Sequence, residues 1–160
     1  MNTTWVIVVI FLVPILIIAL AAKKRVVIAD TPVCTVSQIP AVFERLTNEG
    51  RDGSFAVFMF QPPNKPSSDD AINIQFSIEG GPIGLDWCIT GPSNIRDKEK
   101  FERRVLSLGY KIGEREMNQV KYLRTEDGDL PRLCQKVVCD LYEKNPETKL
   151  ELVVEGFSWP

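Results

Sequence analysis

Histidine is absent from this 160-residue chain. Imidazole is the side chain best suited to proton transfer near neutral pH, and it is the commonest metal ligand. Its absence excludes Ser-His-Asp and Cys-His catalysis, together with metal sites that have histidine ligands. The remaining residues predict no cofactor and no metal site.

Paired-cysteine motifs are also missing, although the chain contains Cys34, Cys88, Cys134 and Cys139. No two of them form a CxxC pair or stand at zinc-finger spacing. Two disulfides are possible in an oxidising compartment, but we expect buried, reduced thiols that pack as small apolar groups. Cys134 and Cys139 are five residues apart on an expected helix, so they lie on different faces and should not bond to each other.

An excess of positive charge is lacking as well. The chain has 19 basic and 21 acidic residues, which gives a net charge of -2. Affinity for nucleic acid depends largely on clustered Lys and Arg that neutralise phosphates, so no nucleic-acid partner is expected. The content of hydrophobic residues, 44%, is typical of a globular domain and not of a disordered chain.

One long uncharged segment stands out at residues 5–22, which read WVIVVIFLVPILIIALAA. As a helix it would span roughly 27 Å, close to the hydrocarbon core of a bilayer, about 30 Å. Pro14 in its middle is tolerated better in membrane helices than in soluble ones, and Trp5 lies where interfacial aromatics are common. We expect residues 1–25 to be a single-pass transmembrane anchor that contacts the lipid bilayer through residues 5–22.

The basic residues Lys23, Lys24 and Arg25 follow this segment directly and are expected at the membrane interface. The positive-inside rule then predicts an N-terminus outside and a soluble domain in the cytoplasm. The alternative is a cleaved signal peptide, because residues 19–21 (ALA) resemble a cleavage site, and cleavage would release a secreted domain. Residues 1–4 carry no basic side chain, which favours the uncleaved signal-anchor.

A connector at residues 26–36 and a single α+β domain at residues 37–160 are expected after the anchor. Apolar alternation, turn residues and helix caps predict the order α-β-β-β-α-β-β-α-β. The expected elements are a helix at 37–48, strands at 54–60, 72–79 and 83–89, a helix at 94–108, strands at 110–115 and 119–125, a helix at 130–144 and a strand at 150–155.

Hairpins, and not helical crossovers, join most of these strands. The sequence therefore predicts an antiparallel sheet with helices packed on one face. In the hairpin of residues 72–89, period-two alternation predicts one buried and one solvated face, with Asp86 on the solvated face beside a core Trp87. The second hairpin, residues 110–125, is more polar and is expected at an edge of the sheet.

This element order across residues 37–142 resembles that of the type III secretion chaperones and the related bacterial YbjN-like family. The resemblance implies a small α+β module that holds segments of other proteins. The transmembrane anchor and the last strand depart from the pattern of those families. No residue role follows from element order alone.

Three clusters resemble ligand sites but have simpler explanations. The glycine-rich turn at residues 79–84 lacks the Lys-Ser/Thr of a phosphate loop, the acids at 126–129 fail the spacing of a calcium loop, and the mixed charges at 96–104 are typical of a solvated helix face. Phe157 and Trp159 are candidate partner-binding residues, because large aromatics in a terminal segment either fold back onto the domain or contact a partner.

The sequence thus predicts a membrane-tethered, non-enzymatic protein-binding or scaffolding module, an accessory subunit of a membrane complex. The polar edge of the second hairpin can accept an added peptide strand. One alternative is an enzyme whose carboxylate and thiol, Asp86 and Cys88, meet in a pocket that only the fold assembles. The other alternative is the secreted domain released by cleavage.

Overall fold

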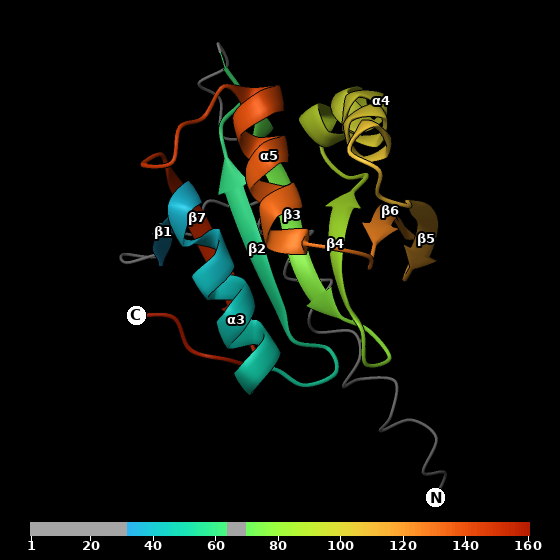
Figure 1. The fold of residues 1–160 in the computed structure, drawn as a ribbon. Coiled ribbons are helices and arrows are strands. Elements are labelled where there is room, and N and C mark those ends of the chain that lie inside the picture. Colours follow the sequence, from blue (N-terminus) through green and yellow to red (C-terminus); the bar gives the residue numbers. More distant parts are fainter. Residues whose placement is uncertain (1–31, 64–69) are drawn as a thin grey trace, which may run out of the picture.

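Seven strands form one antiparallel sheet in the computed structural model, which describes residues 32–63 and 70–160. Three helices lie on the same side of this sheet (Figure 1). The α+β class and the antiparallel sheet predicted from the sequence are confirmed. In chain order the elements are β1 (Val33–Thr35), a single 3-10 turn η1 (Val36–Gln38), α3 (Ile39–Glu49), β2 (Phe55–Phe60), β3 (Ile72–Ile78), β4 (Ile83–Cys88), α4 (Pro92–Ser107), β5 (Gly113–Met117), β6 (Val120–Thr125), α5 (Leu130–Tyr142) and β7 (Lys149–Glu155).

The expected anchor, with Trp5, Lys23, Lys24 and Arg25, lies outside the described residues. Within residues 32–63 and 70–160, no helix has the length and apolar character needed to cross a bilayer.

The order of strands across the sheet is β1-β7-β2-β3-β4-β6-β5. The C-terminal strand β7 pairs with β1 on one side and β2 on the other, so the two ends of the domain meet in the sheet. Strand β1 lies within residues 26–36, which were expected to be a connector. The sequence did not predict it because three residues are too few to show a period-two pattern. The outermost strands are β1 at one edge and β5 at the other.

The core lies between the helices and one face of the sheet. Trp87 on β4 is fully buried, stacks on Phe101 of α4 with ring centroids 4.6 Å apart, and donates its indole N–H to the carbonyl of Asn94. Phe76 on β3 makes edge-to-face contacts with Phe58 and Phe43. Each large side chain that is fully buried contributes about 1.5–3 kcal/mol to stability, so these aromatic contacts fix the helices on this face.

Local sequence signals account for the start of α5. The side chain of Asp129 accepts a hydrogen bond from the N–H of Arg132 at 3.0 Å, and a proline lies in the first turn. An aspartate at this position satisfies a backbone donor that has no partner inside the helix. The predicted cap at Asp129 is therefore confirmed.

The opposite face of the sheet differs from the prediction, because it is not solvated at its centre. Gln75, Ser77 and Asp86 are exposed by only 9%, 6% and 0%. The prediction that Asp86 faces solvent is wrong. Strand β6 pairs with β4 and places Arg124 directly beside Asp86, and this neighbour, 38 residues away along the chain, could not be read from local alternation.

All four cysteines are free thiols. Cys34, Cys88 and Cys134 are buried, and Cys139 is half-buried. Burial raises the pKa of each thiol. A protonated thiol is a poor nucleophile, so these side chains pack as apolar groups in the way expected from the sequence.

Candidate functional site

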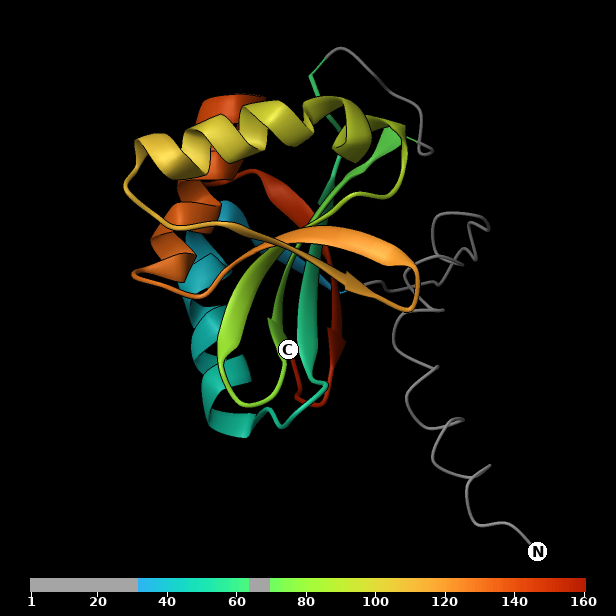
Figure 2. The ribbon, with the colours of Figure 1, turned by 90° about the vertical axis from the view of Figure 1, so that its right-hand side faces the viewer.

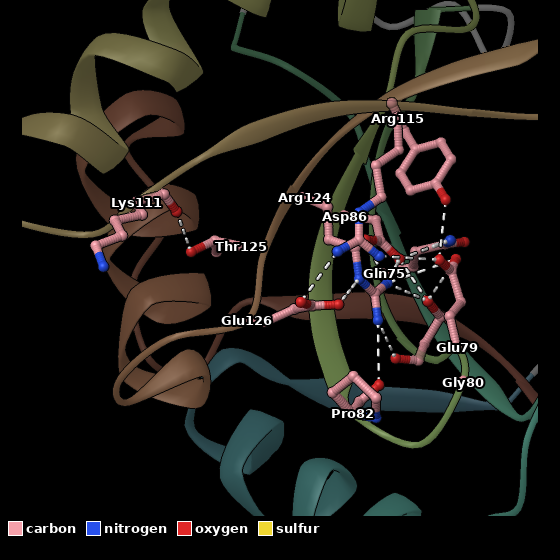
Figure 3. Close-up of polar contacts among 12 residues, drawn as sticks. Gln75, Glu79, Gly80, Pro82, Asp86, Lys111, Arg115, Arg124, Thr125 and Glu126 are labelled. Atoms are coloured by element: carbon pink, nitrogen blue, oxygen red, sulfur yellow. Dashed lines mark hydrogen bonds and ion pairs between the residues drawn. The ribbon is translucent and has the colours of Figure 1, made fainter.

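A buried ion pair between Arg124 of β6 and Asp86 of β4 lies on the sheet face opposite the helices (Figure 3). The Arg124 Nη1 atom is 2.8 Å from Asp86 Oδ1 and 3.0 Å from Oδ2. Ser77 donates its hydroxyl to Asp86 at 2.6 Å, and Gln75 donates its amide N–H at 3.2 Å. The carboxylate on β4 thus receives hydrogen bonds from both neighbouring strands, β3 and β6.

Gly84 makes room for the Arg124 guanidinium. A Cβ atom at position 84 would overlap the Cζ, Nε and Nη1 atoms of Arg124, and Gly84 does not have a positive φ. The glycine is therefore required for space and not for backbone conformation. The guanidinium also donates to the carbonyls of Ser77 and Pro82, both at 3.2 Å, which ties it to the turn between β3 and β4.

A second layer of ion pairs extends this network to strand β5. The Arg124 Nε atom donates to Glu126 at 2.7 Å, and Arg115 on β5 donates to the same carboxylate at 3.0 Å. Tyr122 donates its hydroxyl to Glu79 at 2.9 Å. Figure 2 shows the β5–β6 hairpin crossing the sheet and extending away from α3 and α5. The network therefore holds the hairpin against the β3–β4 turn.

The electrostatics of this site favour a structural role for its ionisable groups. Burial raises the pKa of Asp86 to about 6, although Arg124 and Ser77 oppose the shift. The hydrogen bond from Arg124 holds the pKa of Glu126 below its usual range. Burial, together with the charges of Asp86 and Glu79, raises the pKa of the Cys88 thiol to about 12. At pH 7 Asp86 is mainly ionised and paired, and the thiol is protonated.

The two residues named for the enzyme alternative, Asp86 and Cys88, lie two positions apart on the same face of β4, and both are packed. Neither borders the shallow cavity of about 260 Å³ formed elsewhere in the described part of the chain. No group of three Cys, Asp or Glu side chains within residues 32–63 and 70–160 is placed to hold a metal ion. The cavity is lined by Met59, Phe60, Gln61, Ala71, Lys144, Thr148, Lys149 and Glu151.

The free edge of β5 is the second part of the candidate site. All five residues of this strand are exposed. Asn118 and Gln119 form the hairpin loop with φ values of 50° and 68°, so Met117 and Val120 are the closing, hydrogen-bonded pair. Hydrogen-bonded and non-bonded pairs alternate in an antiparallel ladder, so the alternate positions, 114 and 116, point their N–H and C=O groups away from β6.

The pairing of β6 with β4 supports this assignment independently. The N–H of Ile89 donates to the carbonyl of Lys121 at 2.8 Å, so the odd-numbered residues of β6 bond to β4 and the even-numbered residues bond to β5. Gly113, Arg115 and Met117 are the residues opposite those even positions. Glu114 and Glu116 are thus left with outward backbone groups, and no hydrogen bond from the described residues satisfies them.

The other edge of the sheet, at β1, is capped by side chains. Gln38 accepts a hydrogen bond from the outward N–H of Thr35 at 2.8 Å, and Trp159 donates its indole N–H to the carbonyl of Val33 at 3.2 Å. The strand has only three residues. Short strands and covered backbone groups are the usual means by which proteins block edge pairing.

Trp159 and Phe157, the candidate partner-binding residues, fold back onto the domain. Both are half-buried and pack against the core. Arg45 on α3 lies 5.9 Å from the Trp159 ring and donates to the carbonyl of Ser158 at 2.9 Å. The structure thus places Trp159 at the capped β1 edge, far from β5 in the strand order, and the partner-binding role of both aromatics stays a prediction.

Sequence reasoning missed Arg124 and Gly84, the two residues on which the buried network depends. One signal was present: Arg124 shares a face of β6 with Val120 and Tyr122, and an arginine on an apolar strand face needs a buried partner. Its partner cannot be identified without the strand order.

Comparisons of this chain with protein-family models, with curated proteins and with solved structures return no match. The resemblance to type III secretion chaperones and YbjN-like proteins therefore stays a prediction from element order.

Proposed function

We propose that this protein is a membrane-tethered, non-enzymatic binding module that captures an extended segment of a partner protein by adding it as a strand beside β5. An accessory subunit of a membrane complex needs such a surface. Added strands gain affinity from main-chain hydrogen bonds and specificity from alternate side chains.

The observation that carries this proposal is the difference between the two edges of the sheet. At β1 the outward N–H of Thr35 and the outward C=O of Val33 are bound by Gln38 and Trp159, whereas no described residue binds the outward groups of Glu114 and Glu116 at β5. Natural sheets protect edges that have no partner. The unprotected edge is also held rigidly, through Arg115 by the charged network and through Glu114 by Lys98 of α4 at 2.8 Å.

Site-specific photocrosslinking in native membranes tests the proposal. A photoreactive residue at position 117, at the end of β5, should give a discrete adduct with a protein partner, whereas the same probe at position 33, on β1, should not. Glu116→Pro should abolish the adduct, because proline removes the outward N–H without affecting a bond to β6.

Glu116→Ala is the matched control, since it removes the side chain and keeps the N–H; the adduct should persist at about half its yield or more. Circular dichroism of both variants checks that the fold is retained. Equal adducts at positions 117 and 33, or an adduct that survives Glu116→Pro in a folded protein, would contradict strand addition at β5.

The membrane tether rests on residues 5–22 and on the basic residues 23–25 after them. Uncharged segments of this length partition into bilayers. Full-length protein should resist extraction from membranes by alkaline carbonate. Mass spectrometry of the mature protein should show that its first residue lies before Lys23. Protein that washes free, or that begins at Lys23, would remove this part of the proposal.

A further inference from the structure

The side chains of β5 restrict which sequences can lie beside it. Resting on the proposed function, we propose that the partner segment carries a basic-acidic-basic triplet, with an apolar residue before it and an aromatic residue after it when the strand runs antiparallel to β5. Read from its N-terminus, such a strand has an order of the type Val-Lys-Glu-Lys-Phe.

The two faces of β5 present different side chains. Glu114 and Glu116 lie opposite Leu123 and Lys121, on the helix side of the sheet, as the contact of Glu114 with Lys98 of α4 confirms. The residues between and beyond them, Gly113, Arg115 and Met117, lie on the other face. An added strand meets the two glutamates on one face and the remaining three residues on the other.

Charge complementarity then assigns the middle three positions. Directly opposite side chains of unlike charge stabilise a pair of strands, and like charges destabilise it. Basic residues belong opposite Glu114 and Glu116, and an acidic residue belongs opposite Arg115. Of the three charged residues, Glu116 should contribute most to the preference for this sequence, because it makes no ion pair with the described residues. Glu114 already contacts Lys98 at 2.8 Å and Lys121 at 3.9 Å.

The sizes of Gly113 and Met117 determine which residues fit at the two outer positions of the added strand. Nothing lies within 4 Å of where a Cβ atom of Gly113 would be, so this strand residue leaves an uncovered stretch of backbone. An aromatic side chain on the neighbouring strand is the group that covers such a glycine in sheets. At the other end Met117 is 39% exposed and offers an apolar, adaptable contact.

A second copy of this chain does not satisfy the same pattern. Two β5 strands related by a two-fold axis at Arg115 would place arginine opposite arginine and Glu114 opposite Glu116. An axis at Glu114 or at Glu116 would place that glutamate opposite itself. Each arrangement sets like charges against each other, so the edge favours a different polypeptide.

One segment of the chain, residues 95–101, contains two stretches of similar order, Ile95-Arg96-Asp97-Lys98 and Lys98-Glu99-Lys100-Phe101, but it is not available as a strand. It lies within α4, and Phe101 is fully buried in the core and stacked on Trp87. The partner segment must therefore come from another protein.

Two synthetic peptides of equal composition test the inference against the full chain in mild detergent at low salt. One contains Val-Lys-Glu-Lys-Phe with a glutamate in its flanking Ser-Thr residues, and the other contains Val-Glu-Lys-Glu-Phe with a lysine at the same flanking position, so each has two lysines and two glutamates. The first peptide should bind about tenfold more tightly than the second, because the second peptide replaces two or three favourable cross-strand charge pairs with unfavourable ones. Amide chemical shifts should change most at residues 114 and 116.

Glu116→Lys should reduce this preference by at least threefold, whereas Glu44→Lys should leave it unchanged. Glu44 is exposed on α3, so its substitution makes the same charge change away from the edge. If both peptides bind equally at β5, the sequence preference is overturned and strand addition stands. If neither peptide binds while crosslinking at position 117 succeeds, the preference is again overturned alone. If both experiments fail, the proposed function fails with it.

Discussion

At the scale of single residues, the stability of the sheet depends on one guanidinium. The side chain of Arg124 is 1% exposed and contacts Asp86, Ser77, Glu126 and the carbonyl of Pro82. A buried pair of this kind contributes little net stability when intact, but removing one partner leaves an uncompensated charge. Substitutions in the network should therefore have effects that differ sharply from those of surface ion pairs.

Arg124→Met is expected to lower the free energy of unfolding by about 3 kcal/mol, because it retains the aliphatic stem and leaves Asp86 buried without its cation. Arg103→Met is the matched control. Arg103 is 71% exposed, and within the described part of the chain its ion pair is with Glu99 one turn away, so its loss should cost less than about 0.5 kcal/mol. Urea unfolding of the full-length protein in mild detergent measures both. Equal effects of the two substitutions would contradict the network.

Gly84→Ala is expected to destabilise the protein by about 1–3 kcal/mol, because the added methyl group overlaps the guanidinium. The penalty should fall below about 1 kcal/mol when it is measured in the Arg124→Met background, where Cζ and Nη1 are absent and only the flexible methyl end of the side chain reaches the position of Nε. Gly113→Ala should change stability by less than about 0.5 kcal/mol, since its methyl group meets open space. A double-mutant cycle by urea unfolding checks the coupling, and additive effects would argue against it.

Asp86 should make stability depend on pH in an unusual direction for a carboxylate. Its pKa is raised by burial to about 6 from 3.8, so the folded state binds the proton more tightly than the unfolded state does. This contribution is fully present below pH 3.8 and is lost as the pH rises through 6.

Comparison of the protein with its Asp86→Asn variant isolates this contribution. The free energy of unfolding of the unmodified protein, relative to that of the variant, should fall by on the order of 2 kcal/mol between pH 4 and pH 7. Urea unfolding at four pH values suffices. A constant difference across this range would show that burial does not shift the Asp86 carboxyl.

At the scale of elements, the C-terminal segment after β7 acts as a clip on β1. Trp159→Ala should cost about 1 kcal/mol and accelerate amide exchange in β1 and β7, because it removes the indole donor and the contact with Arg45. Trp159→Phe keeps an aromatic ring and removes the indole donor, so its stability and its amide exchange rates should lie between those of Trp159→Ala and those of the unmodified protein. Hydrogen exchange with mass spectrometry resolves the strands. Unchanged exchange in Trp159→Ala would show that the clip does not protect the edge.

The elements were predictable to different degrees for physical reasons. Alternation and turn residues located the β3–β4 hairpin, and the cap at Asp129 located α5, since these signals are local. Strand β1 was missed because it is held by β7, more than 110 residues later. The buried Asp86 was misplaced because its environment depends on β6, which the local pattern of β4 does not contain.

At the scale of the whole molecule, the two edges of the sheet differ: side chains cap the β1 edge, and no described residue caps the β5 edge. The β1 edge is capped by segments distant in the chain, Gln38 and Trp159, and the β5 edge is built by a hairpin with a charged sequence. Apart from β1, the order of the strands and α-helices could be predicted from the sequence. The difference between the two edges could not, because it depends on which strand lies last on each side of the sheet.

The capped β1 edge also determines stoichiometry. Linear growth by strand addition requires two open edges on each molecule, whereas under the proposed function only the β5 edge accepts a strand, so each copy would terminate such a chain. Each copy should therefore bind one partner segment, and this one-to-one ratio should not rise when more of the segment is added. A fibre should form only after Trp159 has been released from Val33.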